Sequence, residues 1–325
     1  MNHEETKIPS SFTETVQLVE SYALEQIQQE TEQKQLYYHT VTHAIAVKRR
    51  ANIIFQAIKP SLETNSNSLE LDRLANLIDL CATAHDLVQE IIPATKANTA
   101  RKRPVRVSEL ATIAKLTEYI KNLNIKLSKQ NIRDSAKFND LDIQIITEAI
   151  AATICELDPL AANPNSGLSP NSIYQPYLYN SETKLSLVAN IIALADLGTL
   201  GMEGIEPYLH EGILIFLEEN LDLVKLISTN NYIERQSDLE HHQHKDTTKR
   251  RLLNMTRFMV NLAKDRQVRF KQEITAFSEE AQHILQHQVF KYLNVNTINK
   301  IEELTPTDEN NSLIELLAFF HMYSQ

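Results

Sequence analysis

Apolar residues recur at helical spacing along most of this chain. Residues 11–30 begin with Ser11 and, three positions later, Glu14, which is the capping-box pattern of a helix N-terminus. Apolar side chains then follow one face of the predicted helix, at Val16, Val19, Ala23 and Ile27. No stretch shows convincing alternation of apolar and polar residues with a period of two. The pattern therefore predicts an all-α protein.

Similar spacing predicts further helices along the chain. Their ranges are about 41–58, 69–86, 107–128, 140–157, 183–198 and 248–275, with another pair within 204–227 and two shorter helices at the end. The helix that begins near Val41 is expected to stop before Pro60, because proline lacks the N–H that a helix interior requires. Residues 59–68 (KPSLETNSNS) then have the composition of a loop.

Two other segments have the composition of irregular structure. Residues 91–106 contain two prolines and five basic residues, which are Lys96, Arg101, Lys102, Arg103 and Arg106. Residues 158–180 contain four prolines and are predicted to form one long loop. Long loops in compact domains are often functional or mobile, so this segment is a candidate for either role.

Composition narrows the class of protein further. The five glycines are few for a sheet-rich fold of 325 residues, which again favours helices. A net charge of −10 argues against general binding to nucleic acid. The longest apolar stretch, 185–202, holds Asn190 and Asp196 and is too short and polar to span a bilayer. Cys81 and Cys155 lie in apolar helical contexts, and no secretory signal is evident, so we expect a reduced, cytoplasmic protein without a membrane partner.

Ionisable residues occur where the pattern predicts burial. Residues 77–84 are apolar or small on nearly all helix faces, and His85 and Asp86 follow directly. Asp196 likewise follows five apolar residues. A buried carboxylate without a partner costs several kcal/mol, on the order estimated for desolvated charges, so each of these must be compensated.

Taken singly, each residue has a simpler explanation. His85 could be a hydrogen-bonded core histidine, Asp86 could face solvent, and Asp196 could cap the segment at Gly198. His43 lies on a predicted helix with Val41, Ala44 and Val47, which also faces inward. Two imidazoles and two carboxylates on three inward helix faces form a plausible ligand set for a divalent cation, and helical bundles can present such ligands to their cores.

The ordered motifs YHTVTH, AHD and LAD resemble those of the HD superfamily of metal-dependent phosphohydrolases. The resemblance covers about residues 37–200 and implies an all-α bundle there. The helical pattern of about 201–325 predicts a C-terminal extension, and the whole chain is expected to form a single domain. It implies that one divalent metal ion (Mn, Mg, Fe, Ni or Zn) is bound by His43, His85, Asp86 and Asp196. One ion is expected, because no histidine that could serve a second site occurs between Asp86 and His210.

The YHxxxH form is also similar to the start of the cyclic-nucleotide phosphodiesterase site, where the earlier histidine is a general acid. That role would fall on His39, with Asp86 available to accept a proton from the attacking water. A spacing of four places His39 and His43 on one side only if the helix already includes residue 39. The implied reaction is hydrolysis of a small, nucleotide-like phosphoester by metal-activated water.

A phosphate substrate also requires cations and a polar lining. Arg101, Lys102 and Arg103 are candidates to bind it, with an ordinary solvated charge run as the alternative. Thr153 is a candidate to line the cavity. Arg266 and Arg269 could reach a pocket, but a charged helix face is the simpler interpretation. The histidines of 241–244 (HHQH) and the pair His283 and His287 are interpreted as surface residues.

Two other hypotheses remain open. The chain could be a non-catalytic regulatory protein that keeps the HD fold and binds a metal or nucleotide without turnover. Alternatively, the four ligands could be coincidental residues of a helical scaffold. A separation of His43 from His85 by more than about 10 Å would favour that last hypothesis, because metal–ligand bonds are about 2 Å.

Overall fold

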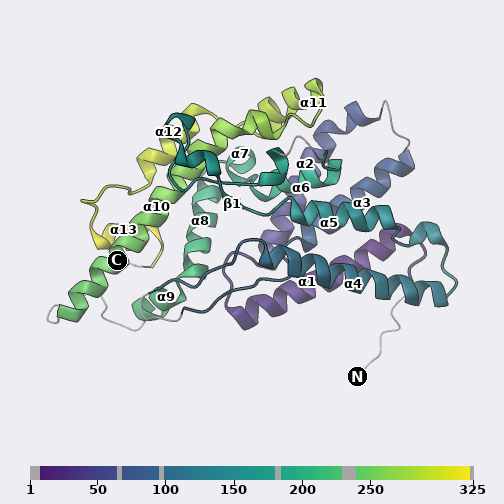
Figure 1. Ribbon diagram of the computed structural model, residues 1–325, viewed down its shortest axis with the longest axis horizontal. Coiled ribbons are helices and arrows are strands. Elements are labelled where there is room, and N and C mark those ends of the chain that lie inside the picture. Colours follow the sequence, from purple (N-terminus) through teal and green to yellow (C-terminus); the bar gives the residue numbers. More distant parts are fainter. Residues whose placement is uncertain (1–7, 64–67, 95–98, 180–183, 229–238, 323–325) are drawn as a thin grey trace.

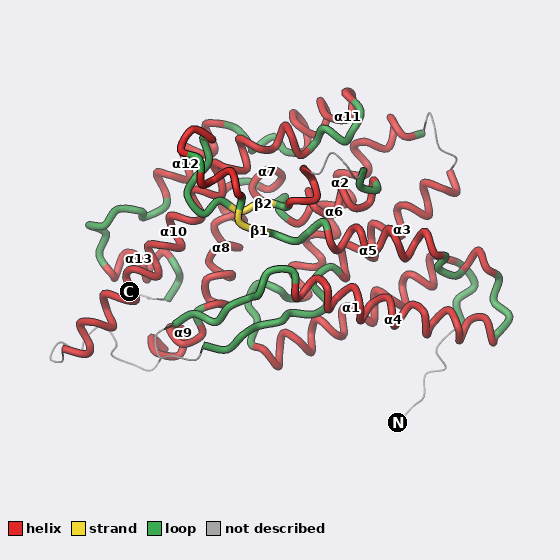
Figure 2. Tube along the Cα trace, in the orientation of Figure 1, coloured by secondary structure: helices red, strands yellow, loops and turns green. Residues whose placement is uncertain are grey.

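Helices dominate the computed structural model of the chain, which describes residues 8–63, 68–94, 99–179, 184–228 and 239–322 (Figure 1). Over these residues there are thirteen α-helices, one π-helical turn and one sheet of two strands. The strands are yellow in Figure 2, and each has two residues. The prediction of an all-α protein is therefore confirmed.

The chain up to Asp196 supplies six helices and both strands. The helices are α1 (Phe12–Lys34), α2 (Val41–Leu62), α3 (Ser68–Ala84), α4 (Val107–Lys129), α5 (Asp140–Ala151) and α6 (Leu187–Asp196). The antiparallel strands are β1 (Glu156–Leu157) and β2 (Ile173–Tyr174), and β2 lies within residues 158–180, which were predicted to be one long loop. Ser11 caps α1 as predicted, because its Oγ accepts a hydrogen bond from the backbone N–H of Glu14.

The rest of the chain adds seven helices. They are α7 (Thr199–Glu203), α8 (Ile205–Glu219), α9 (Leu221–Ser228), α10 (Leu239–Glu273), α11 (Glu279–Ile284), α12 (Val295–Leu304) and α13 (Leu313–Phe319), with a π-helical turn at Leu285–Val289. The long helix α10 runs from the neighbourhood of α13 back towards α11 (Figure 1). α11 and the π-helical turn then pack against α2.

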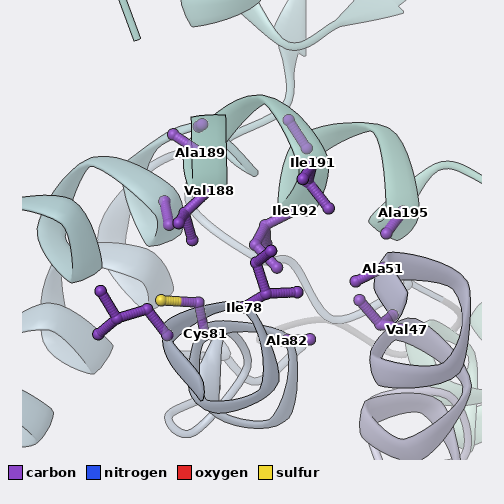
Figure 3. Close-up of a cluster of buried hydrophobic side chains, with 14 of the residues drawn as sticks. Val47, Ala51, Ile78, Cys81, Ala82, Val188, Ala189, Ile191, Ile192 and Ala195 are labelled. Carbon is purple, nitrogen blue, oxygen red and sulfur yellow. The ribbon is translucent and has the colours of Figure 1, made fainter. Parts of the chain in front are cut away.

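Helix α6 lies at the centre of the main hydrophobic core. All of its residues from Val188 to Ala195 are buried, and it packs against α2, α3 and α5. Figure 3 shows the contact surfaces, formed by Val188, Ala189, Ile191, Ile192 and Ala195 of α6, Ile78, Cys81 and Ala82 of α3, and Val47 and Ala51 of α2. The small alanine side chains let the three helices approach closely. This packing fixes where the ends of α3 and α6 lie relative to α2.

The C-terminal helices do not form a separate layer. Two smaller apolar clusters hold α8, α9, α10, α12 and α13 together. Phe270 and Ile274, at the end of α10, belong instead to the main core with residues of α1 to α6. The C-terminal part of the chain is thus joined to the N-terminal helices through shared buried side chains.

Several predicted helix boundaries were wrong. Helix α2 continues through Pro60 to Leu62, since Pro60 sits in its last turn and the Glu63 N–H still reaches the Lys59 carbonyl at 3.1 Å. Helix α5 ends at Ala151, before the residues that lead into β1. Helix α10 begins at Leu239, well before residue 248. Of the helices in the described part of the chain, none has both the length and the apolar character needed to cross a lipid bilayer.

Candidate metal centre and cavity

Three helix ends meet at the predicted ligand residues. His43 lies in the first turn of α2, whereas His85 and Asp86 follow immediately after α3 ends at Ala84. Asp196 is the last residue of α6. Because α6 packs against both α2 and α3, residues that are up to 153 positions apart are brought to one point.

The four side chains converge within a few ångströms. His43 Nε2 lies 3.4 Å from Asp86 Oδ2 and 3.5 Å from Asp196 Oδ1. His85 Nε2 lies 3.1 Å and 3.6 Å from the same two oxygens. The centroids of the His43 and His85 rings are 5.3 Å apart. This distance is well below the separation of about 10 Å that would have favoured coincidental residues of a helical scaffold.

The hydrogen bonding of the two histidines fits a cation. His85 Nδ1 lies 2.9 Å from the Ala82 carbonyl, and this contact assigns the ring proton to Nδ1. His85 Nε2 and both nitrogens of His43 are buried and have no hydrogen-bond partner among the described residues. Ligands bound at 2.0–2.2 Å lie about 3.0 to 3.5 Å from one another for right-angle to tetrahedral coordination, which is close to the four distances above.

The charges at this point also suit a cation. Burial raises the pKa of Asp86, but His85 and His39 outweigh it and hold that pKa well below its usual range. Burial also raises the pKa of Asp196, but contacts with His43 and His85 lower it by more. The pKa of Asp196 is therefore below its ordinary value. Burial lowers the pKa of His43, which favours the neutral imidazole that a metal requires. Both carboxylates are therefore ionised at neutral pH beside a neutral His43. Burial lowers the pKa of His85, but Asp86 and Asp196 raise that pKa well above its usual range, so a metal ion would displace a proton from His85.

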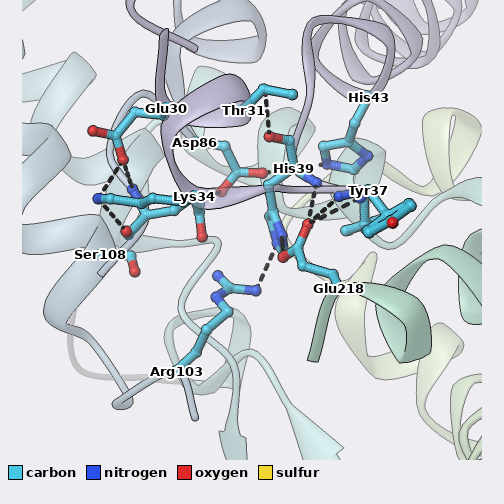
Figure 4. A network of polar contacts seen from close by, with 12 residues as sticks. Glu30, Thr31, Lys34, Tyr37, His39, His43, Asp86, Arg103, Ser108 and Glu218 are labelled. Carbon is cyan, nitrogen blue, oxygen red and sulfur yellow. Dashed lines mark hydrogen bonds and ion pairs between the residues drawn. The ribbon is translucent and has the colours of Figure 1, made fainter. Parts of the chain in front are cut away.

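His39 is positioned differently from what the spacing suggested. Helix α2 begins at Val41 with Thr40 as its N-cap residue, so His39 precedes the helix, and the condition under which a spacing of four would place His39 beside His43 is not met. Its Nδ1 instead lies 2.5 Å from Oε1 of Glu218, at the end of α8. Figure 4 shows the His39 ring between the Glu218 carboxylate and the guanidinium of Arg103, whose Nη1 is 2.6 Å from His39 Nε2.

Glu218 is a residue of the candidate site that sequence reasoning missed. Its Oε2 accepts backbone N–H groups from Tyr37, Tyr38 and His39 at 2.9 to 3.1 Å. Burial raises the pKa of Glu218, but His39 and these backbone donors lower it to about 2. In the sequence, Glu218 stands in FLEEN as an ordinary acidic residue at a helix end, and no local pattern links it to His39.

A cavity of about 720 Å³ opens beside the ligand set, and we call it the main cavity. Of the predicted site residues, its lining includes His39, Asp86, Lys102, Arg103, Thr153 and Asp196. The Thr153 hydroxyl proton is already donated within the chain, from Oγ1 to the Ile150 carbonyl at 2.8 Å. Glu109, in the first turn of α4, also lines the cavity and was not anticipated.

Arg101 has a structural position, in contrast to the predicted role in substrate binding. Its Nε donates to the Glu218 carbonyl at 2.5 Å, at the end of α8. Its two Nη groups donate to the carbonyls of Lys34 and Gln35, at the end of α1, at 2.5 and 2.9 Å. A cation at two helix C-termini satisfies carbonyls that have no partner inside their helices. Arg101 therefore holds the basic segment 91–106 against the ends of α1 and α8, and its guanidinium is not available to the main cavity.

The opposite wall of the main cavity comes from the C-terminal helices. Phe216 of α8 and Met255, Phe258 and Leu262 of α10 supply apolar surface there, together with Arg250 and Arg251. Arg251 is held by Asn220 and Asp222. The resemblance had placed the site within about 37–200, so this wall was not predicted.

The remaining candidates fall outside the ligand set. Arg266 and Arg269 do not form a charged helix face, because both are buried in ion pairs, with Glu273 and Asp158 respectively. His283 and His287 are exposed on the surface, as predicted. The side chains of 241–244 lie outside those that the structure describes.

Comparison with known proteins identifies no family, no curated protein and no solved structure that matches this chain. The function is consequently inferred from the arrangement of the chain's own residues.

Proposed function

We propose that this protein is an HD-type metal-dependent phosphohydrolase that cleaves a small, nucleotide-like phosphoester. The observation that carries the proposal is the meeting of His43, His85, Asp86 and Asp196 at one point, where Asp86 and Asp196 line the main cavity. One divalent ion, drawn from Mn, Mg, Fe, Ni and Zn, suits this mixed set of nitrogen and oxygen ligands. Two free cysteines, Cys81 and Cys155, suit a reducing cytoplasmic compartment.

A divalent cation held by these residues would polarise a phosphoryl oxygen and lower the pKa of a coordinated water. Side chains of the protein would then accept and donate the protons. Asp86 is ionised, and its Oδ1 is fixed by the Gln89 side-chain amide at 2.9 Å. The carboxylate is therefore held in one orientation at the cavity wall, where it can accept a proton from the attacking water.

His39 would serve the leaving group through Nε2, because Nδ1 is occupied by Glu218. Arg103 now donates to Nε2, which keeps that nitrogen unprotonated, since arginine does not give up its proton. A substrate phosphate would compete for Arg103, because guanidinium groups bind phosphate oxygens in bidentate fashion. Once Arg103 turns to the phosphate, Nε2 is free to take up a proton from solvent and to pass it to the leaving oxygen, and Glu218 stabilises the imidazolium between these two transfers.

The main cavity favours a nucleotide-like substrate over a simple phosphate. Its volume lies within the range of roughly 300–1,000 Å³ that is usual for small-ligand sites. Lys102 and Arg103 lie on the wall with Asp86, whereas Phe258 and Met255 offer apolar surface to a ring. A molecule with an anionic end and an apolar, flat end matches both walls.

The test is metal content and activity in the same preparation. Purified protein should contain about one divalent ion per chain, and a phosphoester panel with each of the five metals should reveal hydrolysis. Asp86→Ala should lose both the metal and the activity. Asp134→Ala is the matched control, because Asp134 is a 98% exposed aspartate paired with Lys137 on the surface. Folded wild-type protein that binds none of these metals would refute the proposal.

A non-catalytic regulatory role is the second candidate, and one contact favours it. Arg103 holds His39 Nε2 in the acceptor state, in which His39 cannot act as an acid. If Arg103 keeps this place when ligand binds, the protein would bind nucleotide without turnover. Tight binding with no hydrolysis across the panel would support this role, whereas metal-dependent turnover would exclude it.

A further inference from the structure

A second, smaller cavity adjoins the main cavity beside Asp196, and we call it the side cavity. Its volume is about 70 Å³, and it lies between the end of α6, helix α8 and helix α10. Tyr38, Asp196 and Phe258 line both cavities. The two cavities are therefore neighbours at the end of α6.

The side cavity has mainly apolar walls and one arginine, Arg266, with donors that lack hydrogen-bond partners among the described residues. Its walls include Leu197, Ile215, Met255, Phe258 and Leu262. Arg266 also lines it, with a side chain that is only 5% exposed. Arg266 Nη1 is ion-paired with Glu273, whereas Nε and Nη2 are buried and have no hydrogen-bond partner among the described residues.

The two unsatisfied donors constrain the ligand. A buried donor without a hydrogen-bond partner costs free energy. We therefore expect a ligand whose acceptor atoms form hydrogen bonds with Nε–H and Nη2–H of Arg266. Nε–H and Nη2–H form one edge of the planar guanidinium and point in parallel, which matches two adjacent acceptors. An anionic ligand would meet the carboxylates of Asp196 and Glu211, which line the same cavity. A neutral, flat ring with two acceptors on one edge fits better.

We propose that the side cavity recognises the base of a guanine nucleotide, with Arg266 donating to O6 and N7. Guanine presents these two acceptors side by side, whereas adenine presents one acceptor and one donor on the same edge, and pyrimidines lack N7. The apolar walls contributed by Phe258 and Met255 suit the faces of the ring. This inference rests on the proposed function, because it assigns the base of the nucleotide whose phosphate would lie at the metal centre.

The test compares binding of guanosine, adenosine and cytidine monophosphates to the intact protein by calorimetry, with a chelator present to prevent turnover. Guanosine monophosphate should bind about 5- to 100-fold more tightly than the other two, the range expected for a bidentate contact to a base. The 7-deaza analogue, which lacks N7, should lose most of that advantage. Arg266→Lys should abolish it as well, while keeping a positive charge beside Glu273. Arg257→Lys, on the same helix but paired with Glu309 at the surface, should preserve it.

Each outcome bears on one proposal. Equal binding of the three nucleotides, absence of binding, or full binding of the 7-deaza analogue would overturn the guanine assignment, and these results need no variant to fold. Metal-dependent hydrolysis without base preference would overturn it too, while leaving the proposed function in place. A guanine preference in a protein that binds no metal would instead refute the proposed function and support the side cavity as a binding site.

Discussion

His39 and Glu218 lie 179 residues apart in the chain, and their side chains meet at 2.5 Å between Nδ1 and Oε1. The contact joins the segment that precedes α2 to the end of α8. The same carboxylate also accepts three consecutive backbone N–H groups, from Tyr37 to His39. The C-terminal helices therefore complete a candidate site whose proposed ligands come from the first two hundred residues.

Glu218 should make stability depend on pH in the acid range. Its pKa is about 2 in the folded protein, against an ordinary value of 4.5. A carboxyl whose pKa is lowered by folding stabilises the fold above pH 4.5, and this contribution is lost as the pH falls from about 4.5 to about 2. Wild type should exceed Glu218→Gln in free energy of unfolding by about 3 kcal/mol at pH 7, and by less than half of that at pH 3.

Urea unfolding of both proteins between pH 7 and pH 3 measures this difference. Glu309→Gln is the control, since the Glu309 carboxylate is 73% exposed and its pair with Arg257 should contribute under about 1 kcal/mol. A gap between wild type and Glu218→Gln that stays constant with pH would contradict the account.

The fold class and the four candidate ligands could be picked out from the sequence because their signals are local. His85, Asp86 and Asp196 stand out as ionisable residues within or beside apolar helices, and the helical period is visible without any tertiary information. The arrangement around His39 had no such signal. Glu218 is an ordinary acidic residue until α8 packs beside the start of α2, and only that packing shows its partner.

The buried arginines show the same limit. In the sequence, Arg266 and Arg269 look like members of a solvated helix face, since 248–275 is rich in cations. Their burial depends on residues 158–174 and Tyr179 covering that face, through contacts such as Arg269 Nη2 with Asp158 Oδ2 at 2.6 Å. Arg101 and Arg103 are two positions apart in the sequence and carry the same charge. Only the positions of α1 and α8 show that Arg101 binds helix-end carbonyls, whereas Arg103 lines the main cavity.

Addition of the correct divalent ion should raise the melting temperature of wild type. A ligand present at 100 times its dissociation constant stabilises by about 2.7 kcal/mol, which corresponds to several degrees in Tm. His43→Ala should lose this shift, because His43 Nε2 faces both carboxylates. Thermal scans with Mn²⁺, Mg²⁺, Fe²⁺, Ni²⁺ and Zn²⁺, each with and without chelator, provide the measurement. His283→Ala, an exposed histidine, is the control, and an equal shift in His43→Ala would exclude these residues as the ligands.

Arg269→Ala should release the segment between β1 and β2. Arg269 Nη2 contacts both Asp158 and Ser172, and the Asp158 side chain is only 5% exposed. Removal of one partner from a buried ion pair leaves an uncompensated charge, at a cost of about 3 to 5 kcal/mol. Urea unfolding should show this loss, and limited proteolysis should become faster within 158–174. Arg257→Ala, which breaks a surface pair, should change stability by under about 1 kcal/mol; similar losses in both variants would contradict the prediction.

Arg101→Ala should mainly lower stability, whereas Arg103→Ala should mainly lower activity. Arg101→Ala removes three hydrogen bonds to helix-end carbonyls and should lower the free energy of unfolding by about 1 to 3 kcal/mol. Arg103→Ala removes a group that contacts His39 and lines the main cavity, so it should lower kcat/KM for the hydrolysed phosphoester by about tenfold or more, with little change in stability. Urea unfolding and steady-state kinetics on both variants measure the two quantities. Because the residues are two positions apart and equally charged, each variant is the control for the other, and a loss of kcat/KM in folded Arg101→Ala as large as that in Arg103→Ala would contradict this division of roles.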